Sequence, residues 1–194
     1  MKQFYQKHSL NDTLVVLFHG TGGNQYQLLD FAAETFPHAD ILSYLGDVGE
    51  GATRRFFEPL TADKRLQRED FNARVAKQLE RWQTFLKKEF YPHVIFVGYS
   101  NGANFILGQI AAGIEHVDDV FLLHPSQLDY QFTRSYQSLN VTVTTGANDY
   151  ISTAGSVKQL VHELENYVPQ VTFHLLDGGH ELDQIEIKAI KDTL

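Results

Sequence analysis

Hydrophobic residues along the chain gather in short continuous runs, and these runs predict buried β-strands. Six of them have the length of a strand, at residues 13–19, 39–45, 93–98, 120–124, 141–146 and 171–176. Several are apolar without alternation, which is typical of parallel strands that are covered on both faces. Polar or glycine-rich residues follow each run, and we expect turns there.

Between these runs, hydrophobic residues recur every three or four positions, which predicts amphipathic helices. One such stripe consists of Phe71, Val75, Leu79, Trp82, Leu86 and Phe90, and a second of Val157, Leu160, Val161, Leu164 and Val168. A third segment, residues 101–110, is apolar nearly all round, as a central buried helix should be. Strands that alternate with helices predict an α/β fold: one domain over residues 1–194, with a doubly wound, mostly parallel sheet flanked by helices.

Residues 46–69 follow neither pattern, and a loop of this length in a compact domain is usually functional or disordered. The run Arg-Arg-Phe-Phe at positions 54–57 argues against disorder, so we expect this segment to fold over the sheet edge near the functional site. It leaves no room for a separate lid or cap domain, and we therefore expect an open, shallow pocket.

Four residues of this segment are candidates for contact with a substrate. Phe56 and Phe57 could form one wall of the pocket. Arg54 or Arg55 could meet a polar or anionic group. The alternative is that the phenylalanines fill the core and the arginines are solvated.

Composition narrows the class of protein. Among the 194 residues, 43% are hydrophobic and 21% charged, which is ordinary for a globular domain. The net charge of -8 disfavours nucleic acid and anionic membranes as partners, and a homodimer is left open. The absence of cysteine excludes a disulfide scaffold, a thiolate zinc site and a cysteine nucleophile, and it fits a cytoplasmic location. The first 13 residues lack the apolar stretch of a secretory signal, and no run is long enough to span a membrane.

The pentapeptide Gly-Tyr-Ser-Asn-Gly, residues 98–102, lies between a predicted strand and a predicted helix. A G-x-S-x-G sequence in that position is typical of a nucleophile elbow, a sharp turn that holds the serine hydroxyl above the sheet. Gly98 and Gly102 would be required because larger side chains would collide where strand and helix approach each other. Ser100 is therefore the candidate nucleophile, although a serine in an ordinary glycine-rich turn would give the same short motif.

A serine hydroxyl needs a base and an orienting acid, which in this fold follow in the order serine, acid, histidine. Asp149 and His180 each come directly after a predicted strand, in Gly-Ala-Asn-Asp and Gly-Gly-His-Glu-Leu. We expect His180 to be the base and Asp149 to orient it. Taken singly, either could instead be a turn or capping residue. Asp129, which lies further beyond its own strand, is the alternative acid.

The loop His-Gly-Thr-Gly-Gly-Asn, residues 19–24, follows the first long strand run. We expect the backbone amide of Thr21 to form an oxyanion hole together with the amide of Asn101. A phosphate-binding role is the alternative, but the loop matches neither G-x-x-x-x-G-K-[ST] nor G-x-G-x-x-G. The histidines show no H-E-x-x-H or close pairing, so a metal site is not predicted.

With HGTGGN, GYSNG, GAND and GGHEL in this order over most of its length, the chain resembles the α/β-hydrolase superfamily. It is most similar to the small, lidless phospholipase/carboxylesterase family, which includes acyl-protein thioesterases and hydroquinone-type carboxylesterases. The resemblance implies a cofactor-free serine carboxylesterase that hydrolyses small acyl or aryl esters through an acyl-enzyme. Thioesterase or lysophospholipase activity at the same site, and a catalytically silent protein that binds a small molecule, are the alternatives.

Overall fold

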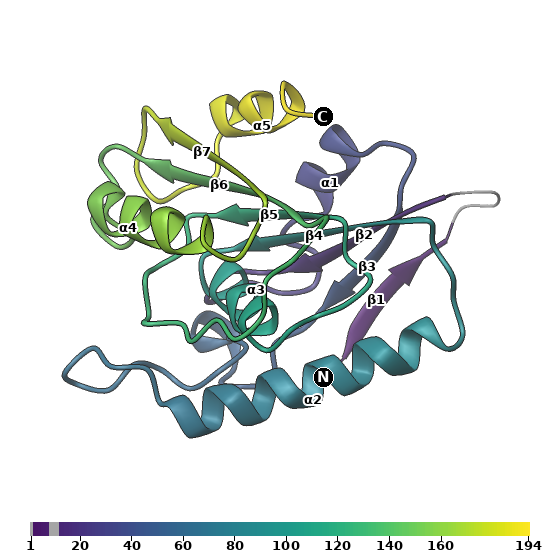
Figure 1. Ribbon diagram of the computed structural model, residues 1–194, viewed down its shortest axis with the longest axis horizontal. Coiled ribbons are helices and arrows are strands. Elements are labelled where there is room, and N and C mark those ends of the chain that lie inside the picture. Colours follow the sequence, from purple (N-terminus) through teal and green to yellow (C-terminus); the bar gives the residue numbers. More distant parts are fainter. Residues whose placement is uncertain (1, 8–11) are drawn as a thin grey trace.

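The computed structural model describes residues 2–7 and 12–194 of the chain. Within these residues, seven strands form one sheet in the order β1-β3-β2-β4-β5-β6-β7 (Figure 1). The strands are β1 (Gln3–Gln6), β2 (Thr13–Phe18), β3 (Asp40–Tyr44), β4 (His93–Tyr99), β5 (Asp119–Leu123), β6 (Asn140–Gly146) and β7 (Gln170–Leu176). Each of the six predicted runs is a strand of this sheet.

Strands β2 to β7 are parallel to one another, and β1 alone runs antiparallel to its neighbour. β1 pairs with β3 at the edge of the sheet, where Gln3 lies opposite Tyr44. The pattern of hydrophobic residues did not predict β1, because the strand has only four residues and exposes a glutamine at each end. The predicted doubly wound, mostly parallel sheet is confirmed.

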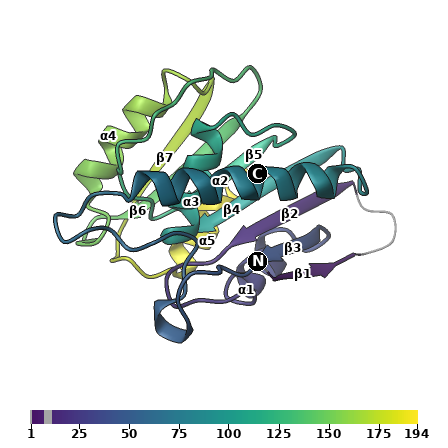
Figure 2. The same cartoon turned by 90° about the horizontal axis from the view of Figure 1, so that it is seen from below.

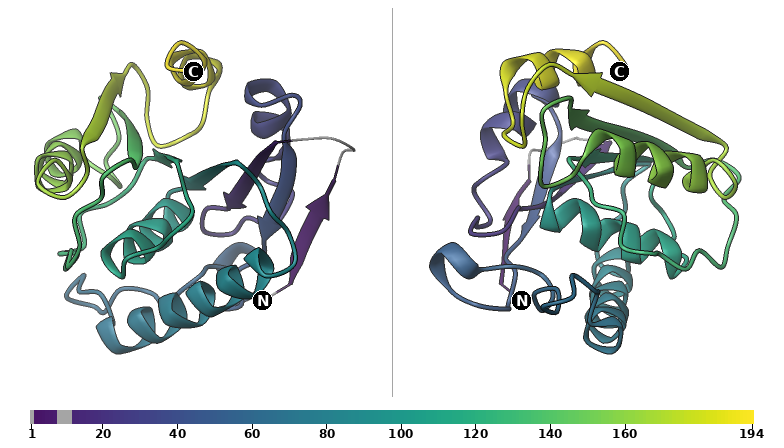
Figure 3. Two further views of the ribbon diagram at one scale, coloured as in Figure 1. Left: turned by 45° about the vertical axis from the view of Figure 1, so that its right-hand side comes forward. Right: turned by 90° about the vertical axis from the view of Figure 1, so that its left-hand side faces the viewer.

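Helices cover both faces of the sheet (Figure 3). They are α1 (Leu29–Thr35), α2 (Arg68–Leu86), α3 (Asn101–Ala111), α4 (Ala154–Leu164) and α5 (Gln184–Lys191), with one short 3₁₀ helix, η1 (Gly51–Thr53). Side chains of α2, α3 and α4 share one core with Leu14, Val16 and Phe18 of β2. Those of α1 and α5 share the other core with Val15 and Leu17. Successive residues of one strand thus face opposite helical layers, which explains the continuous apolar runs.

The central helix α3 lies close to the sheet, and α2 packs across it (Figure 2). Glycine makes the close approach of α3 possible. A Cβ atom at Gly102 would lie 2.0 Å from the carbonyl oxygen of Phe18, and one at Gly98 would lie 2.7 Å from the amide nitrogen of Ala103. Both glycines are therefore required by packing, as the sequence predicts, and they fix the N-terminus of α3 against the ends of β2 and β4.

The segment between β3 and α2 is irregular, as predicted, and a backbone hydrogen bond joins it to the loop that follows β2. Val48 and Arg55 form an isolated antiparallel bridge within it, on either side of η1. The amide of Gly22 donates a hydrogen bond of 2.8 Å to the carbonyl oxygen of Arg54. In the part of the chain that the structure describes, every helix is too short or too polar to cross a lipid bilayer.

Candidate active site

Ser100 occupies the sharp turn between β4 and α3. Its φ and ψ angles are 51° and −110°, a conformation that costs a non-glycine residue about 1–3 kcal/mol and persists only where the surroundings impose it. Its amide donates to the carbonyl oxygen of Leu123 at 2.8 Å, which extends the pairing of β4 with β5 through the turn. This geometry is that of a nucleophile elbow, and the half-buried hydroxyl lies above the carboxyl ends of the parallel strands.

His180 lies between Ser100 and Asp149. Its Nε2 atom is 2.9 Å from Ser100 Oγ, and its Nδ1 atom is 2.7 Å from Asp149 Oδ2. The His180 side chain is 14% exposed and the Asp149 side chain is fully buried. The structure thus brings the three residues together in the predicted order. Asp129, the alternative acid, is exposed, and its amide donates to Gln127 Oε1.

Asp149 is held by four hydrogen-bond donors. Its Oδ1 atom accepts from the amides of Ile151 and Ser152, at 2.9 and 2.8 Å, and its Oδ2 atom is the partner of two histidines. Burial alone would raise the pKa of the carboxyl, but the bonds from Ser152, His180 and His124 together lower it below the usual value. Asp149 is therefore an ionised acceptor, and both histidines must present a protonated Nδ1 to it.

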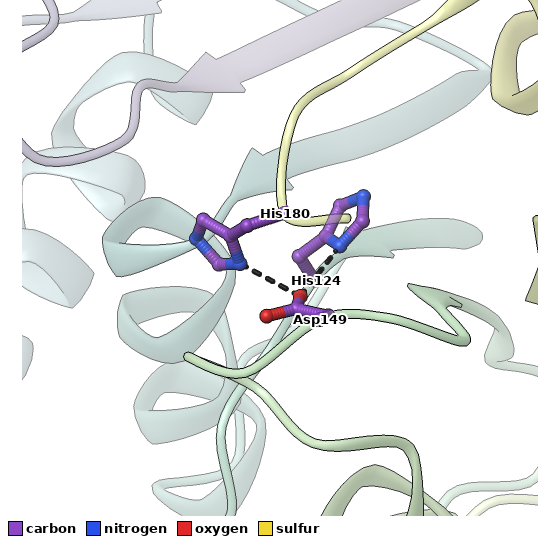
Figure 4. Close-up of side chains that lie close together, drawn as sticks. All are labelled: His124, Asp149 and His180. Atoms are coloured by element: carbon purple, nitrogen blue, oxygen red, sulfur yellow. Dashed lines mark hydrogen bonds and ion pairs between the residues drawn. The ribbon is translucent and has the colours of Figure 1, made fainter. Parts of the chain in front are cut away.

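The second histidine is His124, which sequence reasoning did not select (Figure 4). It follows β5, with a φ angle of 52°, and its Nδ1 atom is 2.9 Å from Asp149 Oδ2. Its Nε2 atom is 3.3 Å from Oε2 of Glu186 on α5. The other oxygen of Glu186 accepts a hydrogen bond from the Thr144 hydroxyl. The signal in the sequence was the position of His124 at the end of a predicted strand.

The atoms of His124, Asp149 and His180 that could bind a metal lie within 4.8 Å of one another. However, each Nδ1 atom is at hydrogen-bond distance from the same carboxylate oxygen, 2.9 and 2.7 Å. The described geometry is therefore that of a hydrogen-bonded group.

Tyr99, at the end of β4, supports the loop that carries His180. Its hydroxyl donates to the His180 carbonyl oxygen at 2.8 Å, and the two rings are 5.6 Å apart. Burial, followed by repulsion from Glu186, Glu181 and Asp149, raises the pKa of Tyr99 to about 12. The hydroxyl therefore remains a neutral donor at physiological pH.

Ser100 opens into a pocket of about 390 Å³. The residues that line it are Thr21, Arg55, Phe57, Leu60, Lys64, Ser100, Asn101, Asn104, Ser126, Gln127, Leu128, Ile151, Ser152, Thr153 and Ser156. Both predicted oxyanion residues, Thr21 and Asn101, are among them. A cavity of about 430 Å³ between α2 and α3 is slightly larger, but no residue of the Ser100, His180 and Asp149 group lines it.

Of the four candidate substrate contacts, Arg55 and Phe57 line this pocket. The predictions for Phe56 and Arg54 are corrected by the structure. Phe56 is fully buried, where its ring stacks on Phe105 with centroids 5.2 Å apart. Arg54 donates from Nη1 to the Gly46 carbonyl oxygen at 3.1 Å, and its neighbour Arg55 lines the pocket instead.

Buried His19 fixes the loop that contains Thr21. Its Nδ1 atom is 2.7 Å from the carbonyl oxygen of Gly20, and its Nε2 atom accepts from the Gly46 amide at 2.9 Å. Because Nε2 accepts a hydrogen bond, the ring is neutral, and burial lowers the pKa of His19 accordingly. Gly20 is also held through its amide, which donates to Gln27 Oε1. The backbone around Thr21 is therefore fixed from both sides.

Comparison with known proteins agrees with the fold. No family model matches the chain. The curated protein "Putative hydrolase MhqD" of Bacillus subtilis (strain 168) is 30% identical over 205 residues, covering 99% of this chain and 96% of its own length. The crystal structure of the Bacillus cereus carboxylesterase has a TM-score of 0.90 and 28% identity, with 100% of this chain and 92% of that chain covered.

A carboxylesterase from Mesorhizobium loti shares the fold, with a TM-score of 0.86 and 22% identity, over 94% of this chain and 88% of that chain. The full-length match to the Bacillus subtilis protein shows the family, and the structural match to the Bacillus cereus enzyme agrees with the fold described above. The chain therefore belongs to the carboxylesterase family of α/β-hydrolases.

Proposed function

We propose that the protein is a serine carboxylesterase that hydrolyses small acyl or aryl esters through an acyl-enzyme. The observation that carries the proposal is the continuous series of hydrogen bonds from Ser100 through His180 to Asp149, beside an open pocket. The names of its relatives, hydrolase and carboxylesterase, support the same class of reaction.

In the acylation step, Ser100 Oγ attacks the carbonyl carbon of the ester while its proton passes to His180 Nε2, 2.9 Å away. The tetrahedral intermediate collapses with cleavage of the bond to the alcohol oxygen, which takes the proton from His180. In deacylation, water attacks the acyl carbon and gives its proton to His180, which returns it to Ser100 as the acid leaves. Asp149 holds His180 in the Nδ1-protonated form throughout.

The oxyanion of the intermediate would be bound by the backbone amides of Asn101 and Thr21. Asn101 is the first residue of α3, so its amide lies at the helix N-terminus, where unpaired N–H groups favour negative charge. The Asn101 side chain is occupied elsewhere, because its Oδ1 accepts from the Phe56 amide at 2.8 Å. Each such backbone donor contributes about 3 kcal/mol to transition-state stabilisation.

The experiment that tests this function is covalent labelling with a fluorophosphonate. Ser100 Oγ displaces fluoride from phosphorus, its proton passes to His180, and a stable phosphonyl ester remains. We expect stoichiometric labelling at Ser100, identified by mass spectrometry of the digested protein. A folded protein that is not labelled, or is labelled at another serine, would show that Ser100 is not an activated nucleophile and would contradict the proposed function.

Chain-length preference is a further expected property of this pocket. The pocket is open, and 11 of its 15 lining residues are polar or charged; the four apolar ones are Phe57, Leu60, Leu128 and Ile151. A methylene group contributes about 0.8 kcal/mol only when it is buried. We therefore expect kcat/KM to be higher for acetyl and butyryl esters than for octanoyl or longer ones, measured on a graded series. A steady rise through C8 to C12, or preference for matched thioesters, would move the assignment to a lysophospholipase or thioesterase.

A further inference from the structure

Three buried charged or titratable groups lie behind the catalytic histidine, on three different elements. His124 follows β5, Asp149 follows β6 and Glu186 belongs to α5. Their exposed fractions are 2%, 3% and 1%. Because a buried ionic group is costly unless it is paired, each must have its partners among the others and their neighbours.

The hydrogen bonds define where the protons can be. Asp149 Oδ2 has only donors around it, so His124 Nδ1 carries a proton. Glu186 Oε1 accepts from the Thr144 hydroxyl, and Oε2 faces His124 Nε2 at 3.3 Å. One further proton therefore lies between His124 Nε2 and Glu186 Oε2. When it is on the nitrogen, His124 is an imidazolium between two carboxylates.

The environment favours the imidazolium. Burial alone would lower the pKa of His124, but hydrogen bonding and charge attraction from Glu186, and then from Asp149, outweigh burial and raise it. Among the described residues, the other titratable groups that face His124 are the Tyr99 ring, 6.0 Å away, and the His180 ring, 5.2 Å away. Tyr99 stays neutral. Glu181, the sequence neighbour of His180, is exposed.

We propose that His124 is a positioning residue that Glu186 holds as an imidazolium. In this form His124 fixes Asp149, and its charge keeps His180 in the basic form down to a lower pH than a neutral residue at position 124 would. The proposal rests on the proposed esterase function for its catalytic consequence. Two separate effects are involved. The Nδ1 donor orients the carboxylate toward His180, and the positive charge opposes the addition of a second proton to His180.

The consequence appears in the acid limb of the pH profile, the range in which activity falls because His180 has taken up a proton. Glu186→Gln keeps a group that can accept from Thr144 and donate to His124 Nε2, so His124 becomes neutral while its Nδ1 still donates to Asp149. The variant removes the positive charge of the His124 ring, 5.2 Å from the His180 ring, and also the negative charge of Glu186 on the far side of His124. Because the nearer charge acts more strongly, protonation of His180 becomes easier, and the two effects partly cancel. We expect the acid limb to move to higher pH by about half a unit.

The matched control is Glu181→Gln, the same change at an exposed carboxylate beside His180. Loss of that negative charge would move the limb slightly to lower pH or leave it in place. The readout is the rate of fluorophosphonate labelling at Ser100 between pH 4 and 9, as well as kcat/KM for a butyryl ester. If the acid limb of the pH profile of the Glu186→Gln variant stays in place or moves to lower pH, the proposal is overturned.

A second measurement needs no catalytic activity. In ¹⁵N-histidine NMR of the unmodified protein, both ring nitrogens of His124 should be protonated at neutral pH, with the signals assigned by their loss in the double variant His124→Asn/Glu186→Gln. Asparagine suits the φ of 52° and can still donate to Asp149. An unprotonated Nε2 overturns the proposal even if Ser100 is labelled. Absence of labelling in the unmodified protein would instead refute the esterase function.

Discussion

Replacement of Ser100 by alanine is expected to lower kcat/KM for a butyryl ester by at least about 10⁴-fold while the protein stays folded. The remaining rate would come only from substrate binding and the oxyanion amides, because no nucleophile is left to form an acyl-enzyme. Stability should change little, because Ser100 is only half-buried and removal of its hydroxyl breaks one side-chain hydrogen bond, the bond to His180. The measurement is steady-state hydrolysis together with urea unfolding of the same preparation.

The control for this prediction is Ser138→Ala, at an exposed serine that does not line the Ser100 pocket. It should leave both hydrolysis and unfolding at the level of the unmodified protein. If Ser100→Ala retained a rate within tenfold of normal, Ser100 could not be the nucleophile.

Gly102→Ala is expected to destabilise the fold strongly. The added Cβ would lie 2.0 Å from the Phe18 carbonyl oxygen and 2.7 Å from that of His19. These are backbone atoms of β2 and its following loop, so they cannot move aside as a side chain can. Overpacking typically costs 1–3 kcal/mol, and we expect at least about 3 kcal/mol here, measured by urea unfolding.

Gly155→Ala on α4 is the matched control. Among the described residues, no atom beyond its chain neighbours and its own helix backbone lies within 4 Å of the Cβ position of Gly155, so this change only adds a better helix former. It should raise the free energy of unfolding by up to about 1 kcal/mol. Similar losses of stability in both variants would mean that α3 does not approach β2 as closely as described.

The sheet could be predicted because its central strands are buried on both faces. That burial requires continuous hydrophobic residues, as in β2, where Leu14 to Phe18 are all buried. β1, α1 and α5 could not be predicted in the same way. β1 depends on pairing with β3, and α5 is only eight residues long with two buried positions, so tertiary contacts rather than their own pattern determine both.

The candidate site was predictable to the extent that its residues follow strands. Ser100, Asp149 and His180 each come directly after a recognisable strand, and parallel strands end at a common edge. Glu186 could not be found because it lies on a helix that was not predicted. In residues 54–57, the sequence could not tell that Arg55 lines the pocket, that Phe57 lines it while also packing in the core, and that Phe56 lies in the core alone.

The catalytic roles, the short-chain preference, the cytoplasmic location and the expectation of no nucleic-acid or membrane partner stay predictions. These predictions differ in the observations that support them. The roles rest on geometry at atomic distances, and the chain-length preference rests on the shape and polarity of one pocket. Location and partners rest only on composition and charge, which describe the chain as a whole and no particular surface.

The strand order also determines when the site can form during folding. Ser100 and His180 are 80 residues apart in the chain, and β5 and β6 lie between the strands that precede them. All pairings from β4 to β7 are parallel and therefore join distant segments, which form slowly relative to local helices. A refolding chain thus regains its helical circular dichroism before it regains a hydrogen bond between Ser100 and His180. Recovered esterase activity is a kinetic marker for completion of this half of the sheet.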